Sequence, residues 1–274
     1  MDEIRALVNE RLQSYLREQR ARAAALAPEA PELVDAVTTL TMRGGKRLRP
    51  AVLVAAFRAV APEWHPAEVV DACAALELLQ TYLLIHDDWM DGDDERRGGP
   101  SVHAALREAH GDTHLGDALA ILAGDLACAQ AWELLALGGD VPPARRREAI
   151  AVFATMQHEV VIGQQLDLIG TADISRMQQL KTGSYTVRGP LLLGAALAGA
   201  SPPQTASLEA YGAPLGEAFQ LRDDLLGTFG DPKQTGKPAG NDLRVGKRTA
   251  LVRAAEELLD PAALLPLQRV LDGL

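Results

Sequence analysis

The sequence predicts an all-α protein. Of its 274 residues, 47% are hydrophobic but only 4% are aromatic, so the core is built from Leu, Ala and Val rather than from rings. Ala and Leu lead the ranking of helix propensities. Apolar residues recur at spacings of three and four, and few stretches alternate as strands require. We therefore expect one all-α domain over residues 1–274.

Charge, cysteine content and hydropathy exclude several classes of protein. The net charge of −10 argues against nonspecific nucleic-acid binding. Cys73 and Cys128 lie in apolar, alanine-rich stretches, which favours two small core residues over a disulfide and fits a reducing cytoplasm. The N-terminus lacks a signal-peptide core, and no apolar run approaches the roughly 20 residues of a membrane span. We expect a soluble, cytoplasmic protein that binds no nucleic acid and crosses no membrane.

Glycine, proline and aspartate divide the chain into amphipathic helices. The helix at 143–168 is unusually polar after Gln157, which indicates either a wet cavity or an exposed face. The loop at 230–248 is rich in Gly, Pro and Lys and reads as a binding loop or lid rather than as a linker, because too few residues follow for a second domain. The predicted helices span residues 2–26, 32–42, a stretch from Ala51, a central stretch ending at Gly92, and then 115–137, 143–168, 173–182 and 190–200.

A basic turn precedes the third helix. Lys46, Arg47 and Arg49 stand beside Pro50, which takes the favoured first-turn position. Cations are unfavourable at the positive end of a helix dipole, unless an anion binds among these side chains and the backbone amides. The turn is therefore either a solvated loop or an anion site.

The central helix ends in an acidic cluster. Helical periodicity puts Asp87 and Asp91 one turn apart on one face, while Asp88 points aside. Such paired carboxylates repel each other unless a cation lies between them, and Mg²⁺ is the hard cation that suits them. Arg96 and Arg97 follow closely enough to fold back beside the cluster, and guanidinium groups suit phosphate oxygens.

A second acidic cluster, Asp223 and Asp224, also ends an apolar helix. Between the two clusters, Lys181 and Thr182 precede Gly183, where we expect a helix to close. A lysine at a helix C-terminus is what the dipole alone would favour, so its functional interpretation depends on the other motifs.

The ordered set of motifs resembles the trans-isoprenyl diphosphate synthases, the family of farnesyl and geranylgeranyl diphosphate synthases. Each motif alone is weak, but the ordered set over about residues 40–250 is specific. The resemblance implies an isoprenoid synthase-type bundle of helices around a central cavity, as a homodimer. The motifs are Gly44-Gly45-Lys46-Arg47-Leu48-Arg49-Pro50, Asp87-Asp88-Trp89-Met90-Asp91, Arg96-Arg97-Gly98, Lys181-Thr182, Phe219-Gln220-Leu221-Arg222-Asp223-Asp224, Gly236-Lys237 and Gly246-Lys247-Arg248.

The resemblance also implies a role for each motif. Three Mg²⁺ ions hold the diphosphate of an allylic substrate, and a second pocket holds isopentenyl diphosphate. No protein nucleophile is needed. Loss of diphosphate from the allylic substrate gives an allylic cation, which the double bond of isopentenyl diphosphate captures. The implied residues are Asp87, Asp91 and Asp223 for the metals, supported by Asp88 and Asp224; Arg96, Lys181, Lys237 and Lys247 for the allylic diphosphate; Lys46, Arg49, Gln80 and Arg97 for the second diphosphate; and Thr182 and Gln220 near the cation.

Two departures and one length determinant complete the comparison with the family. Gly227 stands where many members have a third aspartate, with Asp231 as a candidate substitute, and the segment after Lys247 is short. Tyr82 and Leu83 lie about one turn before Asp87, where a growing product chain arrives, so we expect them to limit product length to fifteen or twenty carbons. Alternatively, Tyr82 only packs in a helix interface.

Two other classes of function share some of these features. A class I terpene cyclase also has an aspartate cluster and Mg²⁺, but it processes a single diphosphate, which leaves Lys46, Arg49 and Arg97 unexplained. A non-catalytic, synthase-like subunit would be expected to have lost aspartates or basic residues, and this chain retains them.

Overall fold

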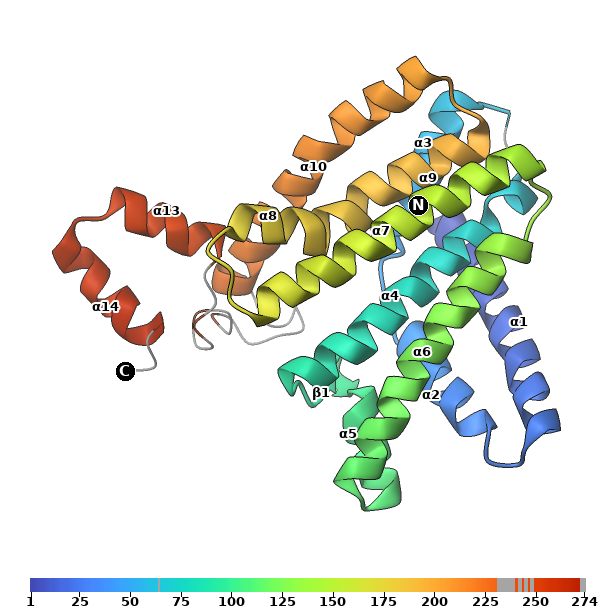
Figure 1. Ribbon diagram of the computed structural model, residues 1–274, viewed down its shortest axis with the longest axis horizontal. Coiled ribbons are helices and arrows are strands. Elements are labelled where there is room, and N and C mark those ends of the chain that lie inside the picture. Colours follow the sequence, from blue (N-terminus) through green and yellow to red (C-terminus); the bar gives the residue numbers. More distant parts are fainter. Residues whose placement is uncertain (64, 231–239, 241–242, 244–245, 247–248, 272–274) are drawn as a thin grey trace. The chain divides into compact units, whose positions relative to one another are not determined.

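The computed structural model describes residues 1–63, 65–230, 240, 243, 246 and 249–271 (Figure 1). These residues are predominantly helical, and strands β1 (Glu95–Arg96) and β2 (Gly99–Pro100) have two residues each, so the all-α prediction is confirmed. The chain folds as two compact units, of which the first is Met1–Val152 with Pro190–Leu208 and the second is Phe153–Gly189 with Glu209–Leu274. The prediction of a single domain stays a prediction.

The first unit contains the helices of the N-terminal half. Those that the sequence predicted lie close to the expected bounds, whereas the helix at residues 102–110 and the short 3-10 helix were not predicted. Pro31 and Pro50 lie in first turns, where the missing amide is harmless. The elements are α1 (Asp2–Leu26), α2 (Pro31–Met42), α3 (Leu48–Val60), the short 3-10 helix η1 (Pro66–Glu68), α4 (Val70–Asp91), α5 (Val102–His110) and α6 (Thr113–Leu137); α7 (Pro143–Leu168), α9 (Gly189–Ala198) and α10 (Pro202–Phe229) contribute residues to both units.

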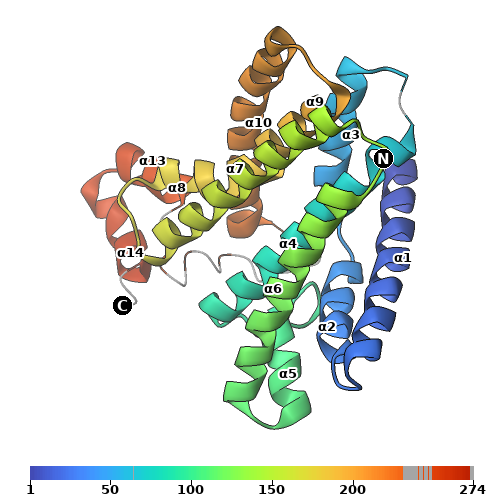
Figure 2. The same ribbon diagram turned by 45° about the vertical axis from the view of Figure 1, so that its right-hand side comes forward.

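Helix α4 is the centre of the first unit, and α6 lies beside it in both views (Figures 1 and 2). Every residue from Ala72 to Leu79 is buried, as expected for a helix that is covered on all sides. The α6 face toward the core is made of small residues. A Cβ on Gly124 would lie 2.2 Å from Nε2 of His86, so only glycine permits this approach of α6 to α4.

Within the described residues, α6 is the one helix long and apolar enough to span a membrane by length and composition alone. Its most apolar window has a mean hydropathy of 1.4 and is 44% buried inside the protein. The sequence analysis did not single out this helix. Because α6 packs against α4 and α5, its apolar residues have a role in the core of the first unit.

The second unit contains the later part of α7, then α8 (Ile174–Gln178), the π-helix η2 (Gln179–Arg188), α13 (Ala250–Leu258) and α14 (Pro261–Leu271). The expected helix end at Gly183 is wrong, because the chain stays helical through it. A Cβ on Gly216 of α10 would lie 3.4 Å from the Cα of Gly183, so this pair of glycines serves a close approach of two helices. A π-helix is rare and often marks a functional site.

Candidate active site

The first acidic motif occupies the last turn of α4. Asp87 is 25% exposed and Asp91 is exposed, whereas Asp88 is fully buried. Gly92 ends the helix in the left-handed conformation, and its amide donates to the Asp88 carbonyl. The predicted separation of Asp88 from its two neighbours is therefore present in the structure.

The hairpin formed by β1 and β2 returns Arg96 to this helix end. Its Nε donates to Oδ1 of Asp88 at 2.6 Å, and its Nη2 bonds the same oxygen. Nη2 is also 3.7 Å from Asp87 and 3.6 Å from Asp93. Burial raises the pKa of Asp88 above the usual aspartate range, although the Arg96 guanidinium opposes that shift. Oδ2 of Asp88 is buried and has no hydrogen-bond partner among the described residues.

The residues present fit Mg²⁺. Helix α4 carries no basic residue in its last turn, so Asp87 and Asp91 add negative charge at the negative end of the helix dipole, where a cation is favoured. Within the described part of the chain, no three acidic, histidine or cysteine side chains are already gathered around a metal position. This arrangement is consistent with the usual coordination of Mg²⁺, which is bound by one or two carboxylates together with substrate phosphates and water.

The basic residues form a separate cluster. Arg97 adopts the left-handed conformation and so diverges from Arg96, and its Nη1 lies 3.4 Å from the Leu40 carbonyl. Burial lowers the pKa of Arg97. Glu77 opposes this shift, and three other guanidinium groups, those of Arg47, Arg49 and Arg96, lower the pKa further. A bound anion would relieve this repulsion, so the predicted association of Arg97 with the basic turn has a physical basis. Lys46 is exposed on the same turn.

Sequence reasoning missed Arg43, and it did not predict the burial of Arg47. Arg43 donates from Nη1 to the Pro100 carbonyl at 2.6 Å and to the Arg96 carbonyl at 3.2 Å, and so fixes the hairpin. A Cβ on Gly99 would lie 2.8 Å from Cζ of Arg43, which explains that glycine. Arg47 is almost fully buried rather than solvated. Only the density of basic residues hinted at either role.

The second acidic motif lies near the end of α10. Asp223 is exposed, while Asp224 is only 4% exposed. Asp224 accepts from Gln220 Nε2 at 2.7 Å, from Gln178 Nε2 at 3.4 Å and from the Ala250 amide at 3.4 Å. Its carboxylate therefore joins α10 to α8 and to the start of α13. Gln220, predicted to act near a cation, is half-buried and held by this bond.

Lys181 lies on the π-helix, where its Nζ donates to Oδ2 of Asp167 at 2.5 Å. A Cβ on Gly163 would lie 2.3 Å from the Lys181 backbone nitrogen, so glycine lets α7 approach the π-helix here. Thr182 is half-buried next to it. The predicted Lys237, Lys247 and Asp231, like most of the loop at 230–248, lie outside the described residues.

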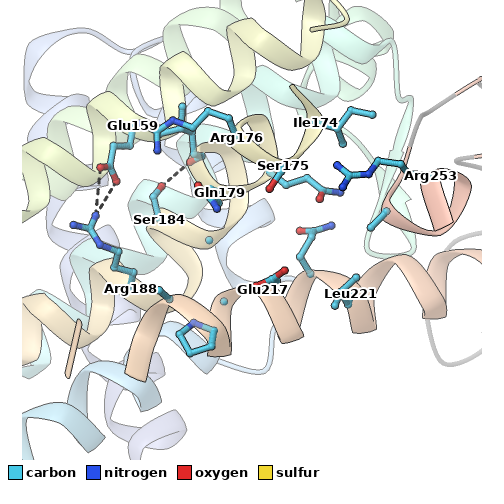
Figure 3. Close-up of a pocket in the computed structure, with 18 of the residues that line it drawn as sticks. Glu159, Ile174, Ser175, Arg176, Gln179, Ser184, Arg188, Glu217, Leu221 and Arg253 are labelled. Carbon is cyan, nitrogen blue, oxygen red and sulfur yellow. Dashed lines mark hydrogen bonds and ion pairs between the residues drawn. The ribbon is translucent and has the colours of Figure 1, made fainter. Parts of the chain in front are cut away.

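A cavity of about 710 Å³ lies within the second unit, between α7, α8, the π-helix, α10 and α13 (Figure 3). Glu159 lines it and bonds Arg188 at 3.2 Å, and Arg188 also bonds Glu209 at 2.6 Å. Part of the polar face predicted on the helix at 143–168 therefore faces a cavity. Gln220 lines the same cavity.

The predicted length determinants lie on two faces of α4. Leu83 shares the face of Asp87, as does Gln80, by helical spacing. Tyr82 instead packs edge to face with His86 at 4.9 Å between ring centroids, and His86 bonds the Ile121 carbonyl of α6 at 3.1 Å. This contact supports the alternative that Tyr82 packs in a helix interface.

Comparison with known proteins places these features in a family. Residues 30–271 match the polyprenyl synthetase family. The chain belongs to that family. The short chain isoprenyl diphosphate synthase of Methanocaldococcus jannaschii is 36% identical over 235 residues, which cover 84% of this chain and 68% of that protein. The geranylgeranyl diphosphate synthase of Methanosarcina mazei is 37% identical over 233 residues, covering 82% and 68%.

Solved structures agree with this polyprenyl synthetase assignment. The geranylgeranyl pyrophosphate synthase of Corynebacterium glutamicum, solved with isoprenyl diphosphate and magnesium, superposes with a TM-score of 0.87 at 33% identity. The match covers 99% of this chain and 86% of that one. The polyprenyl synthetase of Streptomyces coelicolor matches with a TM-score of 0.79 at 30% identity, covering 99% and 78%. The isoprenoid synthase-type fold implied by the sequence is therefore confirmed.

Proposed function

We propose that this polyprenyl synthetase is a Mg²⁺-dependent short-chain trans-prenyl diphosphate synthase. It joins isopentenyl diphosphate head to tail to an allylic diphosphate and gives farnesyl or geranylgeranyl diphosphate. The observation that carries the proposal is the presence, within the first unit, of an acidic helix end and a separate cluster of guanidinium groups, those of Arg47, Arg49 and Arg97. The reaction joins two diphosphate substrates, and the diphosphate group of one of them must leave. It therefore needs the acidic helix end as well as the guanidinium cluster.

We propose that some of the acidic residues bind the metal ions and that the others support these ligands. The accessible carboxylates of Asp87, Asp91 and Asp223 are the ligands, and we expect three Mg²⁺ ions. Asp88 and Asp224 support them from buried positions, each fixed by its own hydrogen bonds. When bound, the metal stabilises the negative charge that develops on the departing diphosphate.

The basic and polar residues are proposed to bind, orient and shield the substrates. Arg96 and Lys181 add positive charge toward the allylic diphosphate while keeping their contacts to aspartate. The side-chain oxygens of Thr182 and Gln220 face the allylic cation, and the departing diphosphate accepts the proton that is finally lost. Water is excluded by apolar walls and by the loop at 230–248. Lys237 and Lys247 complete the allylic site, and Lys46, Arg49, Gln80 and Arg97 hold isopentenyl diphosphate.

A homodimer is the proposed assembly, with α6 as one contact. Its outer face exposes Leu122 by 51% and Leu115 by 41%, and the helix carries no Lys or Arg that would favour an anionic membrane surface. Under a two-fold axis through Leu122, Leu115 of one chain would lie opposite the small Ala129 of the other. Light scattering should give twice the chain mass, and Leu122→Glu should give the monomer mass. We also propose a cytoplasmic location, because Cys73 and Cys128 lie in apolar, alanine-rich stretches that are typical of small core residues.

The deciding experiment is incubation of the purified chain with isopentenyl diphosphate, a series of allylic primers and Mg²⁺, with products read by mass spectrometry. Products longer than the primer by five carbons support the synthase. A cyclic hydrocarbon from the allylic diphosphate alone would support the terpene cyclase instead. No turnover of any primer would leave a non-catalytic subunit.

A further inference from the structure

Arg47 has an unusual place for an arginine. It immediately precedes α3, with a φ of 49° in the left-handed region, which side chains other than Gly, Asn and Asp rarely adopt. Its side chain is 3% exposed, although a charged group is costly to bury unless it is paired and hydrogen-bonded. Backbone strain and charge burial therefore coincide at one residue, and persist only where the surroundings enforce them.

Three helices provide those surroundings. The Arg47 Nη1 donates to Oε2 of Glu77 at 2.5 Å, the Nη2 to the Thr41 carbonyl at 2.9 Å, and the Nε to Oδ1 of Asn9 at 2.9 Å. These partners belong to α4, α2 and α1 respectively. The side chain of Glu77 is also 3% exposed, so the ion pair is wholly inside the first unit. One guanidinium group thus fixes the start of α3 to three other helices.

The pair lies directly behind the basic turn. Lys46 precedes Arg47, and Arg49 follows it by two residues. A Cβ on Gly45 would lie 3.2 Å from Arg47 Nη1 and 3.7 Å from Arg97 Nη1, so the backbone of the turn runs close to both guanidinium groups. Glu77 also attracts the charge of Arg97. The shape of the turn and the position of its cations therefore depend on this pair.

Stability alone does not account for such an arrangement. Replacing a buried ion pair by apolar residues of similar volume is often neutral or stabilising. We propose that Arg47 and Glu77 are positioning residues, which hold the turn so that Lys46, Arg49 and Arg97 present their charges together to a diphosphate. Neither residue touches the substrate. The inference rests on the proposed function for the identity of that diphosphate, isopentenyl diphosphate, but the anion pocket itself can be tested separately.

Two physical effects of Glu77 oppose each other, which makes the proposal testable. Its negative charge repels an incoming anion, so if electrostatics alone mattered, Glu77→Gln would tighten binding of the diphosphate. If the geometry of the turn matters more, the same substitution weakens binding, because the hold on Arg47 is lost. The positioning role predicts a higher KM for isopentenyl diphosphate in Glu77→Gln, and a lower KM would overturn it.

The main test is the double variant Arg47→Met/Glu77→Leu, which leaves no unpaired buried charge. We expect a Tm equal to or above that of the parent and a KM for isopentenyl diphosphate raised about tenfold, equivalent to about 1.4 kcal/mol. The KM for the allylic primer and kcat stay within about twofold. A parental Tm together with a parental KM would show that the pair is only structural. If this variant does not fold, Arg47→Lys keeps the charge but not the three directed bonds, and must show the same rise in KM.

A matched control uses the ion pair of Arg11 with Asp71, which joins α1 to the first turn of α4 at 2.5 Å. The variant Arg11→Met/Asp71→Leu should leave the KM for both substrates unchanged. An equal rise in KM in this control would overturn the positioning role, because loss of any ion pair between these helices would then suffice.

Calorimetry with inorganic pyrophosphate in EDTA separates this inference from the proposed function, because metal-dependent binding is then absent. We expect the parent to bind pyrophosphate and Arg47→Met/Glu77→Leu to bind it about tenfold more weakly. If the parent makes no prenyl product but shows this difference, the proposed function fails and the positioning role stands. Equal affinities, or no binding by the parent, would overturn the inference.

Discussion

The two acidic motifs look alike in sequence, yet their second aspartates are held in different ways. Asp88, at the end of α4, is paired with the guanidinium of Arg96. Among the residues that the structure describes, Asp224, near the end of α10, accepts from the side-chain amides of Gln220 and Gln178 and from one backbone amide. Both are buried, while Asp87 and Asp223 reach solvent. In each motif one aspartate is thus buried at the helix end, while its neighbour is open to solvent.

The difference follows from what each unit brings to its helix end. In the first unit a hairpin returns a cation to α4, so Asp88 sits in a charge pair with Asp87 and Asp93 close by. In the second unit the described partners of Asp224, from α8, α10 and the start of α13, are amide groups. A carboxylate with a buried cationic partner depends strongly on that partner, whereas one held by amides loses less when its charge is removed.

The largest expected effect concerns the exposed aspartates. Asp87→Ala, Asp91→Ala and Asp223→Ala should each lower turnover about a thousandfold or more, because each removes an oxygen ligand of the metal that stabilises the leaving diphosphate. The fold should be intact by circular dichroism. The check is turnover as a function of Mg²⁺ concentration, with Asp140→Ala, an exposed acid elsewhere in the first unit, as control. Turnover independent of Mg²⁺ in the parent would contradict the metal role.

The next effect is on stability at the first motif. Asp88→Asn should lower the free energy of unfolding by about 3 kcal/mol, because Arg96 is left buried without its partner. This value is at the lower end of the free-energy cost of breaking a buried ion pair. The reason is that Asp87 and Asp93 remain near Arg96, at 3.7 and 3.6 Å. Urea unfolding measures it. The double variant Asp88→Leu/Arg96→Met should recover most of the stability but not the activity. A neutral effect of Asp88→Asn would mean that the guanidinium is satisfied without Asp88.

A smaller loss is expected at the second motif. Asp224→Asn should cost about 1 to 2 kcal/mol in the free energy of unfolding, because one acceptor oxygen becomes an amide donor that faces the amide donors of Gln220, Gln178 or Ala250. The same urea experiment compares it directly with Asp88→Asn. A cost at Asp224 equal to or above that at Asp88 would contradict the expected order of the two losses.

The sequence predicted what local signals determine. Helical periodicity and Pro50 located the helices, and the spacing of Asp87 from Asp91 located the carboxylates on α4. It did not predict the burial of Arg47, because that depends on Glu77 thirty residues away, which looks like any other helical glutamate. Nor did it predict the helix through Gly183, since glycine marks a helix end and a close helix contact equally well.

The smallest expected effect distinguishes the two helices as supports for the growing chain. Leu83 lies four residues before Asp87, and Phe219 lies four before Asp223, so each is one turn below its acidic motif. If the product grows along α4, Leu83→Ala and Tyr82→Ala should lengthen it by one or more five-carbon units with little change in the first condensation, whereas Phe219→Leu should not.

The packing of Tyr82 on His86 makes the outcome at that residue informative. If Tyr82 limits the product, Tyr82→Ala lengthens it as Leu83→Ala does. If the ring only supports the contact between α4 and α6, Tyr82→Ala lowers the Tm and leaves the product distribution unchanged, since His86 keeps its bond to the Ile121 carbonyl. Mass spectrometry of the products from the three variants decides between these outcomes. Lengthening by Phe219→Leu alone would show that α10 rather than α4 limits the length of the product.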